Sequence, residues 1–197
     1  VVVEADRAGD LIVITTFNRN TTEVWLVDSH QPNEPAWVVS PRRRGVEYSV
    51  AHLPAEGRGE LLVVTNDGAQ EFRLMRAPVT TSTPEEWRVV VPESADVRLH
   101  EVDVFARHVV LSTVSGGRQL LRVLPRDVVA GGEVSLDAAM TVDAGIPGGL
   151  LTLWHNEEPD VSSVLVEVQS YTDPGQLVQV DLDSGERTVV RSRELPN

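Results

Sequence analysis

Apolar and polar residues form short runs along the chain, and the segment 46–92 shows this pattern most completely. Four runs in it have the alternation, the β-branched content or the continuous apolar character of β-strands, at 46–53, 60–65, 70–77 and 87–91. Between the second and third runs lies Asn66-Asp67-Gly68. Asp-Gly between apolar runs is a strong hairpin signal, because Gly accepts the positive φ of such turns. We therefore predict a module of four antiparallel strands with Gly68 in a turn.

The same rhythm of four runs can be laid over the rest of the chain. The other sets lie at 1–5, 11–17, 22–28 and 37–40; at 97–106, 108–114, 118–124 and 133–136; and at 150–155, 163–170, 176–182 and 186–191. The sets begin roughly 45 to 50 residues apart, a period typical of propeller blades. The sequence thus predicts an all-β fold, a partial β-propeller of about four four-stranded antiparallel blades at 1–45, 46–96, 97–144 and 145–197.

The run 60–65 distinguishes between two all-β architectures. It is almost continuously apolar, which is typical of a strand buried on both faces, as in a blade packed between two others. A two-layer sandwich, the alternative fold, would show cleaner alternation. Helical patterns are confined to 126–130 and 136–140, where they are short and are interrupted by Gly131-Gly132 or by β-branched neighbours.

Composition narrows the range of partners. The chain has 30 acidic and 17 basic residues and a formal net charge of −13, which argues against nucleic acid, since phosphate binding depends on clustered Lys and Arg. An acidic surface suits cationic substrates. The absence of cysteine excludes disulfides, thiol catalysis and a Cys-based zinc site. The N-terminal residues lack a signal-peptide pattern and no apolar run has membrane-spanning length, so we expect a soluble, cytoplasmic protein without membrane contact.

Three stretches carry a resemblance to a known family. They are TTFNRNTTEVWLVDSHQP with SPRRRGVEYSVAHLP, then ELLVVTNDGAQEFRLMRAP, then SYTDPGQLVQVDLDSGERTVVRSRELP. In this order and spacing the chain resembles the N-terminal propeller of the prolyl oligopeptidase family, and within it most closely the oligopeptidase B (protease II) group. One departure is LVEVQSYTDP from Leu165, where the family commonly has an Arg and a Tyr-Ser-Ser run.

The resemblance implies a domain rather than a complete enzyme. In that family a seven-bladed propeller caps an α/β-hydrolase domain with a serine triad, and this chain resembles about the last four blades. Its tail RSRELPN matches the place where the family's chain enters the peptidase domain. The resemblance further implies a parent that cleaves short peptides after Arg or Lys, with the propeller limiting access by size. The expected partners are the parent's peptidase domain and its short peptide substrates.

The residues themselves offer no catalytic machinery. An α/β-hydrolase needs a Gly-x-Ser-x-Gly nucleophile elbow, and this pentapeptide does not occur in the 197 residues. We therefore expect the catalytic domain to be absent and the fragment to be inactive, with no catalytic, cofactor-binding or metal-binding residue and no cofactor. The alternative function is a free-standing propeller-like module that binds a protein or peptide across its repeats.

Two polar features have both a chemical and a structural interpretation. His52, one of five scattered histidines, either lines a central channel or is a half-buried strand residue paired to a neighbour, and we favour the second interpretation. The stretch Asp181 to Glu186 superficially suggests a calcium loop. Its Gly falls fifth rather than sixth and Ser192 stands where a calcium loop has Glu, so we interpret it as a hairpin turn with Gly185 left-handed.

Three surface features are interpreted in the same way. Arg42-Arg43-Arg44 is either a docking site for carboxylates or a solvated connection between blades, and we favour the connection. The tryptophans at 25, 37, 87 and 154 lie on predicted strands and are expected to pack between blades rather than to stack on substrate. Glu157-Glu158-Pro159-Asp160 is interpreted as an exposed acidic turn.

The partial propeller also has a consequence for association. Four blades taken from a ring of seven would leave two blade faces open to water unless they closed into a smaller ring. Such apolar faces favour contact between copies of the chain. We therefore expect a homodimer that uses either the first set, near residues 1–27, or the fourth, near residues 150–190.

Overall fold

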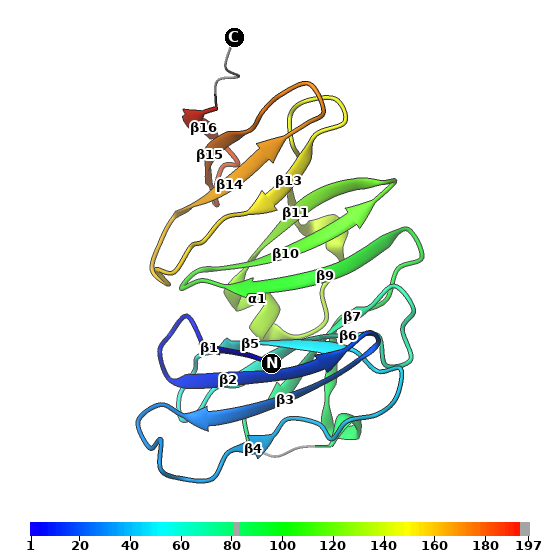
Figure 1. Cartoon of the computed structure of the whole chain (residues 1–197), viewed down its shortest axis with the longest axis vertical. Coiled ribbons are helices and arrows are strands. Elements are labelled where there is room, and N and C mark those ends of the chain that lie inside the picture. The colour runs from blue at the N-terminus through cyan, green and yellow to red at the C-terminus, as the bar shows by residue number, and fades with distance from the viewer. Residues whose placement is uncertain (81–82, 194–197) are drawn as a thin grey trace. The chain divides into compact units, whose positions relative to one another are not determined.

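The computed structural model describes residues 1–80 and 83–193, and their strands form four antiparallel sheets of four strands each (Figure 1). Neighbours within each sheet follow chain order, so every sheet is a meander. The predicted all-β fold with four four-stranded sheets is therefore confirmed. Of the tail RSRELPN, residues 194–197 lie outside the described residues. No helix in the described part of the chain is long and apolar enough to cross a membrane.

The elements are as follows. The first sheet consists of β1 (Val2–Ala5), β2 (Leu11–Asn18), β3 (Thr21–Asp28) and β4 (Trp37–Val38). The second consists of β5 (Tyr48–Leu53), β6 (Glu60–Thr65), β7 (Arg73–Pro78) and β8 (Arg88–Val91). The third consists of β9 (Val97–Val104), β10 (His108–Ser115), β11 (Arg118–Pro125) and β12 (Met140–Val142). The fourth consists of β13 (Leu150–Leu153), β14 (Ser163–Gln169), β15 (Gln176–Asp181) and β16 (Arg187–Ser192). Short helices are η1 (Pro84–Glu86), α1 (Arg126–Gly131) and η2 (Leu136–Ala138).

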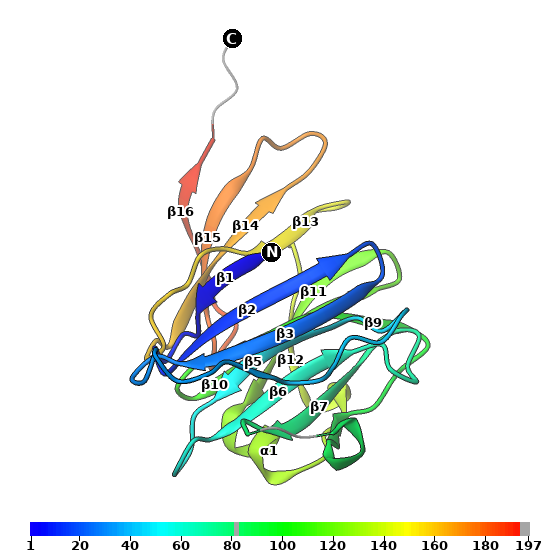
Figure 2. The ribbon, with the colours of Figure 1, turned by 60° about the horizontal axis from the view of Figure 1, so that its bottom comes forward.

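The sheets group in pairs into two compact units. The first unit comprises Val1–Ala95 with Gly132–Val134 and contains the first and second sheets. The second comprises Asp96–Gly131 and the residues from Ser135 on, with the third and fourth sheets. Figure 2 shows β1, β2 and β3 of the first unit side by side. The predicted blade limits stay a prediction, since what the structure defines is the sheets.

Each unit has one apolar core that both of its sheets supply. In the first unit the core includes Leu11, Val13, Val24 and Leu26 of the first sheet and Leu61, Val63, Met75 and Trp87 from the second sheet and its connections. In the second unit Val110, Leu121 and Val123 of the third sheet pack with Val164, Val166 and Val178 of the fourth. A single sheet could not bury its apolar face alone, so packing in pairs supplies the burial that stabilises each unit.

A buried tyrosine adds a polar link between the first two sheets. The hydroxyl of Tyr48, on β5, donates to the carbonyl of Ser40 (2.7 Å) and accepts from the backbone N–H of Val24 on β3 (2.9 Å). The Tyr48 ring also meets Trp87 edge to face, with centroids 6.1 Å apart. Burial, partly offset by these hydrogen bonds, raises the pKa of the Tyr48 hydroxyl, so this group stays a neutral donor.

Burial patterns follow the apolar runs of the sequence. In β6 the residues from Leu61 to Thr65 are all buried, as expected for a strand covered on both faces. β14 instead alternates strictly, with Val164, Val166 and Val168 buried and the residues between them half-buried. β1 is exposed throughout. The edge strand β1 thus carries apolar residues, Val2 and Val3, that remain exposed.

The last strand of the third sheet differs from the prediction. We expected it at 133–136, but the strand is β12, and Leu136–Ala138 is the helix η2. The N–H of Val134 instead donates to the carbonyl of Val90 on β8 at 2.7 Å. The extended segment therefore finds a backbone partner outside its own sheet, and the chain returns to the third sheet six residues later.

The connection between β6 and β7 is longer than the predicted hairpin. A first turn is closed by the N–H of Ala69 on the carbonyl of Asn66, and a second by the N–H of Phe72 on the carbonyl of Ala69, both at 3.0 Å. Phe72 has φ 64°, so β7 begins at Arg73 rather than at residue 70. Gly68 has the predicted positive φ, at 65°.

We predict that Gly68→Val destabilises the first unit by about 1 kcal/mol or more, because a β-branched residue is strained at positive φ. A Cβ at Gly68 would have no neighbour closer than 3.8 Å, so the cost is conformational rather than steric. Urea denaturation followed by tryptophan fluorescence measures it. Gly68→Asn is the matched control, since Asn tolerates this conformation and should lose less stability. If both variants had the same urea midpoint as the parent chain, the positive φ of Gly68 would not be the cause of a loss of stability.

Candidate functional site

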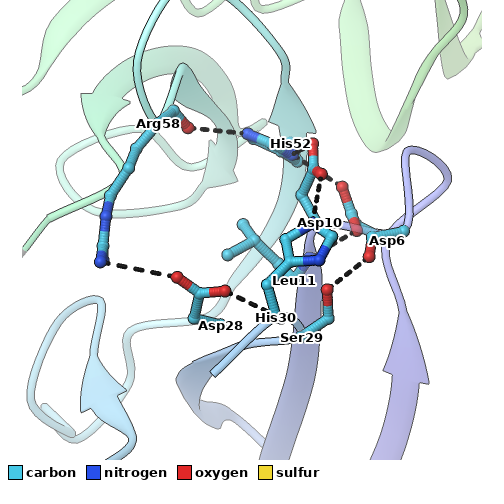
Figure 3. A network of polar contacts seen from close by, with 9 residues as sticks. Asp6, Asp10, Leu11, Asp28, Ser29, His30, His52 and Arg58 are labelled. Atoms are coloured by element: carbon cyan, nitrogen blue, oxygen red, sulfur yellow. Dashed lines mark hydrogen bonds and ion pairs between the residues drawn. The ribbon is translucent and has the colours of Figure 1, made fainter. Parts of the chain in front are cut away.

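His52 lies on β5, one residue before the strand ends, and its side chain is 4% exposed. Its backbone pairs with Leu61 of β6, and the imidazole points out of the second sheet toward the β1–β2 turn of the first (Figure 3). The favoured interpretation, a strand residue paired to a neighbour, agrees with this placement. The residue is buried rather than half-buried, and its partner comes from another sheet.

Two carboxylates flank the turn that joins β1 to β2. Asp6 directly follows β1 and Asp10 directly precedes β2. The N–H of Gly9 donates to the backbone carbonyl of Asp6 (3.0 Å), and the N–H of Leu11 donates to Asp6 Oδ1 (2.8 Å). The turn therefore fixes the Asp6 side chain, which is 4% exposed, whereas the Asp10 side chain is 46% exposed.

The imidazole has an acceptor at each nitrogen. His52 Nδ1 donates to Asp6 Oδ2 at 2.7 Å and lies 4.0 Å from Asp10 Oδ2. His52 Nε2 donates to the backbone carbonyl of Arg58 at 2.9 Å. Because both partners can only accept, the imidazole is satisfied with a proton on each nitrogen. Gly59 permits the approach, since a Cβ there would lie 3.0 Å from His52 Nε2 and 2.5 Å from a backbone oxygen.

Burial and pairing act in opposite directions on the two charges. Burial opposes the charge on His52, but the hydrogen bonds to Asp6 and to the Arg58 carbonyl, with the charges of Asp6 and Asp10, raise the pKa of His52 above its ordinary value. Burial likewise opposes ionisation of Asp6, yet the hydrogen bonds from His52 and from the Leu11 N–H lower the pKa of that carboxyl. The stability due to His52 is thus lost as pH rises through its raised pKa, and that due to Asp6 as pH falls through its lowered pKa.

A cavity of about 200 Å³ opens beside this pair. It is lined by Asp10, Leu11, Asp28, His30, His52, Pro54, Ala55, Gly57 and Arg58. Arg58 lies 3.5 Å from Asp28, and His30 Nε2 lies 3.2 Å from Asp10 Oδ1 (Figure 3). Among the described residues, Asp6, Asp10 and His52 form the group whose ligand atoms, within 4.8 Å of one another, could hold a metal ion.

A second histidine and carboxylate meet in the second unit. His108 Nε2 donates to Asp183 Oδ1 at 2.9 Å, and Arg107 lies 3.5 Å from the other oxygen of Asp183. His108 Nδ1 is buried and has no hydrogen-bond partner within the described ranges. In the same turn, Asp181 Oδ1 accepts from the N–H and the hydroxyl of Ser184 at 2.7 and 2.8 Å. The turn bonds to itself, as the hairpin interpretation predicts, and Gly185 has φ 74°.

The charged surface features also form local contacts. Arg43 donates twice to Asp67, at 2.6 and 3.3 Å, and the Arg42 guanidinium donates to Thr16 Oγ1 at 2.7 Å. These are exposed contacts within the first unit, as expected for a solvated connection. Residues 157–160 are exposed, as predicted for an acidic turn.

Some of the four tryptophans pack between sheets, whereas Trp154 is exposed. Trp37 on β4 donates from Nε1 to the carbonyl of Val79 after β7 (2.7 Å), which links the two sheets of the first unit as expected. Trp87 and Trp154 lie next to strand ends rather than on strands, because β8 begins at Arg88 and β13 ends at Leu153. Trp87 is buried, whereas Trp154 is 39% exposed and does not pack as predicted.

Sequence reasoning did not single out Asp6 or Asp10. Asp6 and His52 are 46 residues apart, and no local motif connects a turn of the first sheet to a strand of the second. The only local signal is a pair of aspartates around the Gly9 turn.

The chain matches the family model described as "Prolyl oligopeptidase, N-terminal beta-propeller domain" over residues 1–193. It is 24% identical to Protease 2 of Moraxella lacunata over 186 residues, 94% of this chain and 24% of that protein. It is 29% identical to the Prolyl endopeptidase-like protein of Gallus gallus over 114 residues, 57% of this chain and 15% of that protein. The chain thus spans about a quarter or less of the length of these relatives.

Solved structures of oligopeptidases contain the same fold as this chain. Oligopeptidase B from Leishmania major superposes with a TM-score of 0.82 at 23% identity, covering 98% of this chain and 27% of that one. Oligopeptidase B from Trypanosoma brucei, with covalently bound antipain in a closed form, gives a TM-score of 0.78 at 23% identity over the same shares. At this identity the likeness establishes the fold.

We predict that Asp6→Asn destabilises the first unit by about 3 kcal/mol, because it leaves the buried imidazole of His52 without its counter-charge. Urea denaturation with fluorescence detection suits this measurement, since three of the four tryptophans lie in the first unit. Asp10→Asn is the control: its half-exposed carboxylate lies 4.0 Å from the imidazole and should contribute about 1 kcal/mol or less. A loss in Asp6→Asn no larger than in the control would refute the buried pair.

Proposed function

Because this chain belongs to the prolyl oligopeptidase family, we propose that it is the non-catalytic propeller portion of a serine oligopeptidase that resembles oligopeptidase B. The observation that carries the proposal is the match of residues 1–193 to the family's N-terminal propeller domain. In homologous full-length chains this domain accompanies a peptidase domain, and the 197 residues contain no nucleophile elbow. The peptidase domain is thus the proposed partner of this chain.

The proposed role of the propeller is to admit only short peptides to the active site of the parent enzyme. The parent enzyme is proposed to cleave these peptides after Arg or Lys. The similarity to Protease 2 over 94% of this chain and the likeness to oligopeptidase B structures support this choice within the family. The net charge of −13 supports it independently, since an acidic surface attracts peptides that carry Arg or Lys. The cytoplasmic location stays a prediction.

The gene sequence beyond Asn197 tests this proposal directly. An α/β-hydrolase sequence with Gly-x-Ser-x-Gly in the same frame is the expected result. A stop codon there would instead favour the free-standing interaction module. Where the longer product exists, it should hydrolyse short arginyl or lysyl peptides and leave folded proteins intact.

We predict that the 197-residue chain does not hydrolyse arginyl or lysyl ester or amide substrates, because it has no nucleophile elbow. The measurement compares release of the leaving group with a buffer blank. A mock preparation from cells that lack the gene serves as the control for host peptidase. Turnover that exceeds both would contradict the prediction.

We also propose that the chain forms a homodimer through an exposed sheet face. Val3, Ile14, Trp25 and Val38 pair in sequence across the four strands of the first sheet, on the face opposite its core. Val3 is 62% exposed and the other three are half-buried. The corresponding row of the fourth sheet, Thr152, Glu167, Leu177 and Arg191, is mostly polar, so the first sheet is the better contact.

Sedimentation equilibrium in 0.15 M salt should therefore give twice the monomer mass of 21.6 kDa. Burial of even a few hundred Å² of apolar surface, at about 25 cal/mol per Å², supplies several kcal/mol for association. Ile14→Lys should yield a monomer, whereas Thr152→Lys on the fourth sheet should remain dimeric. A monomer mass for the parent chain at all accessible concentrations would defeat the proposal.

A further inference from the structure

We propose that Asp6, Asp10 and His52 form a binding site for a divalent transition-metal ion, with Zn²⁺ as the preferred ion. The three side chains come from two sheets, yet their ligand atoms lie within 4.8 Å of one another. Two carboxylates and an imidazole are a donor set that zinc accepts in proteins. Calcium and magnesium are less suited, because they prefer oxygen donors throughout.

Two of the three ligands are held in place before any ion arrives. The side chains of His52 and Asp6 are each 4% exposed. Asp6 Oδ1 accepts from the Leu11 N–H, which leaves Oδ2 directed at the imidazole. His52 Nε2 donates to the Arg58 carbonyl, which leaves Nδ1 as the nitrogen that can bind a metal. This is the outer hydrogen bond by which metal-binding histidines are usually oriented.

The ion would replace a proton in this arrangement. His52 Nδ1 gives its proton to solvent, its lone pair binds the metal, and the two carboxylates balance the charge of the ion. Zinc holds nitrogen and oxygen ligands at about 2.0–2.2 Å, so neighbouring ligands lie roughly 3.4 Å apart. The 2.7 Å contact between His52 and Asp6 must widen by several tenths of an ångström, and the 4.0 Å gap to Asp10 must close by a similar amount.

The third ligand, Asp10, connects the site to solvent. The Asp10 side chain is 46% exposed and lines the cavity of about 200 Å³, which has room for the ion and for water as a fourth ligand. His30 contacts the outer oxygen of Asp10 at 3.2 Å and can hold that carboxylate in place. Figure 3 shows the side chains of Asp6 and Asp10 close together beside His52. Because the ligands belong to the first and second sheets, a bound ion would join the two sheets of the first unit.

The test is isothermal titration calorimetry, in which Zn²⁺ is added to the 197-residue chain after EDTA treatment and removal of the EDTA. We expect one ion per chain, and a rise in the urea midpoint of tryptophan fluorescence when the ion is bound. Asp10→Asn should weaken the affinity by at least about tenfold. Asp183→Asn is the matched control: it alters the other His–Asp pair, which belongs to no three-ligand group among the described residues, and should leave the affinity unchanged.

Substitution of the buried ligands Asp6 or His52 could unfold the chain. Asp10→Asn avoids this problem, because the half-exposed Asp10 side chain contributes little to the stability of the fold. The proposal is overturned if the parent chain shows no saturable binding, or if Asp10→Asn binds as tightly as the parent. It is equally overturned if binding is lost in His30→Ala but retained in Asp10→Asn, since that result would place the ion on an exposed histidine.

Discussion

The packing of two sheets on one apolar core is the constraint on which the rest of this structure depends. A meander of four short strands cannot bury its apolar residues alone, and in each unit apolar residues of both sheets pack into a shared core. β6 is buried at five of its six positions and β10 at five of its eight, because both strands lie inside their sheets and carry Val and Leu at successive positions.

Polar contacts between turns and strands then fix how paired sheets meet. In the first unit the Tyr48 hydroxyl, the Trp37 indole and the His52–Asp6 pair each join the two sheets. In the second unit His108 meets Asp183, and Gln119 accepts from the Leu151 N–H at 3.1 Å. Hydrophobic burial is not directional, so these buried and partly buried hydrogen bonds specify one arrangement among the many that would bury similar area.

The surroundings of Asp6, Asp10 and His52 determine which hydrogen bonds these residues can make. The buried imidazole of His52 lies between the Asp6 carboxylate and the Arg58 carbonyl and donates a hydrogen bond to each. A metal ion bound by Asp6, Asp10 and His52 would join the two sheets of the first unit.

The sequence by itself determined the class of fold, the number of sheets and most strand limits to within about two residues. Those features depend on local patterns: Glu60–Thr65 was located at both ends because its apolar run is bounded by turn residues, and Gly68 and Gly185 have the positive φ that their turns require. Local patterns failed at residues 133–136, where the chain forms its backbone hydrogen bond with Val90, and at Phe72, whose positive φ no propensity would suggest. Only the tertiary structure brought Asp6 and Asp10 to His52, because their proximity results from the packing of two sheets. Side-chain contacts across 46 residues are set by that packing, to which each local stretch contributes only a part.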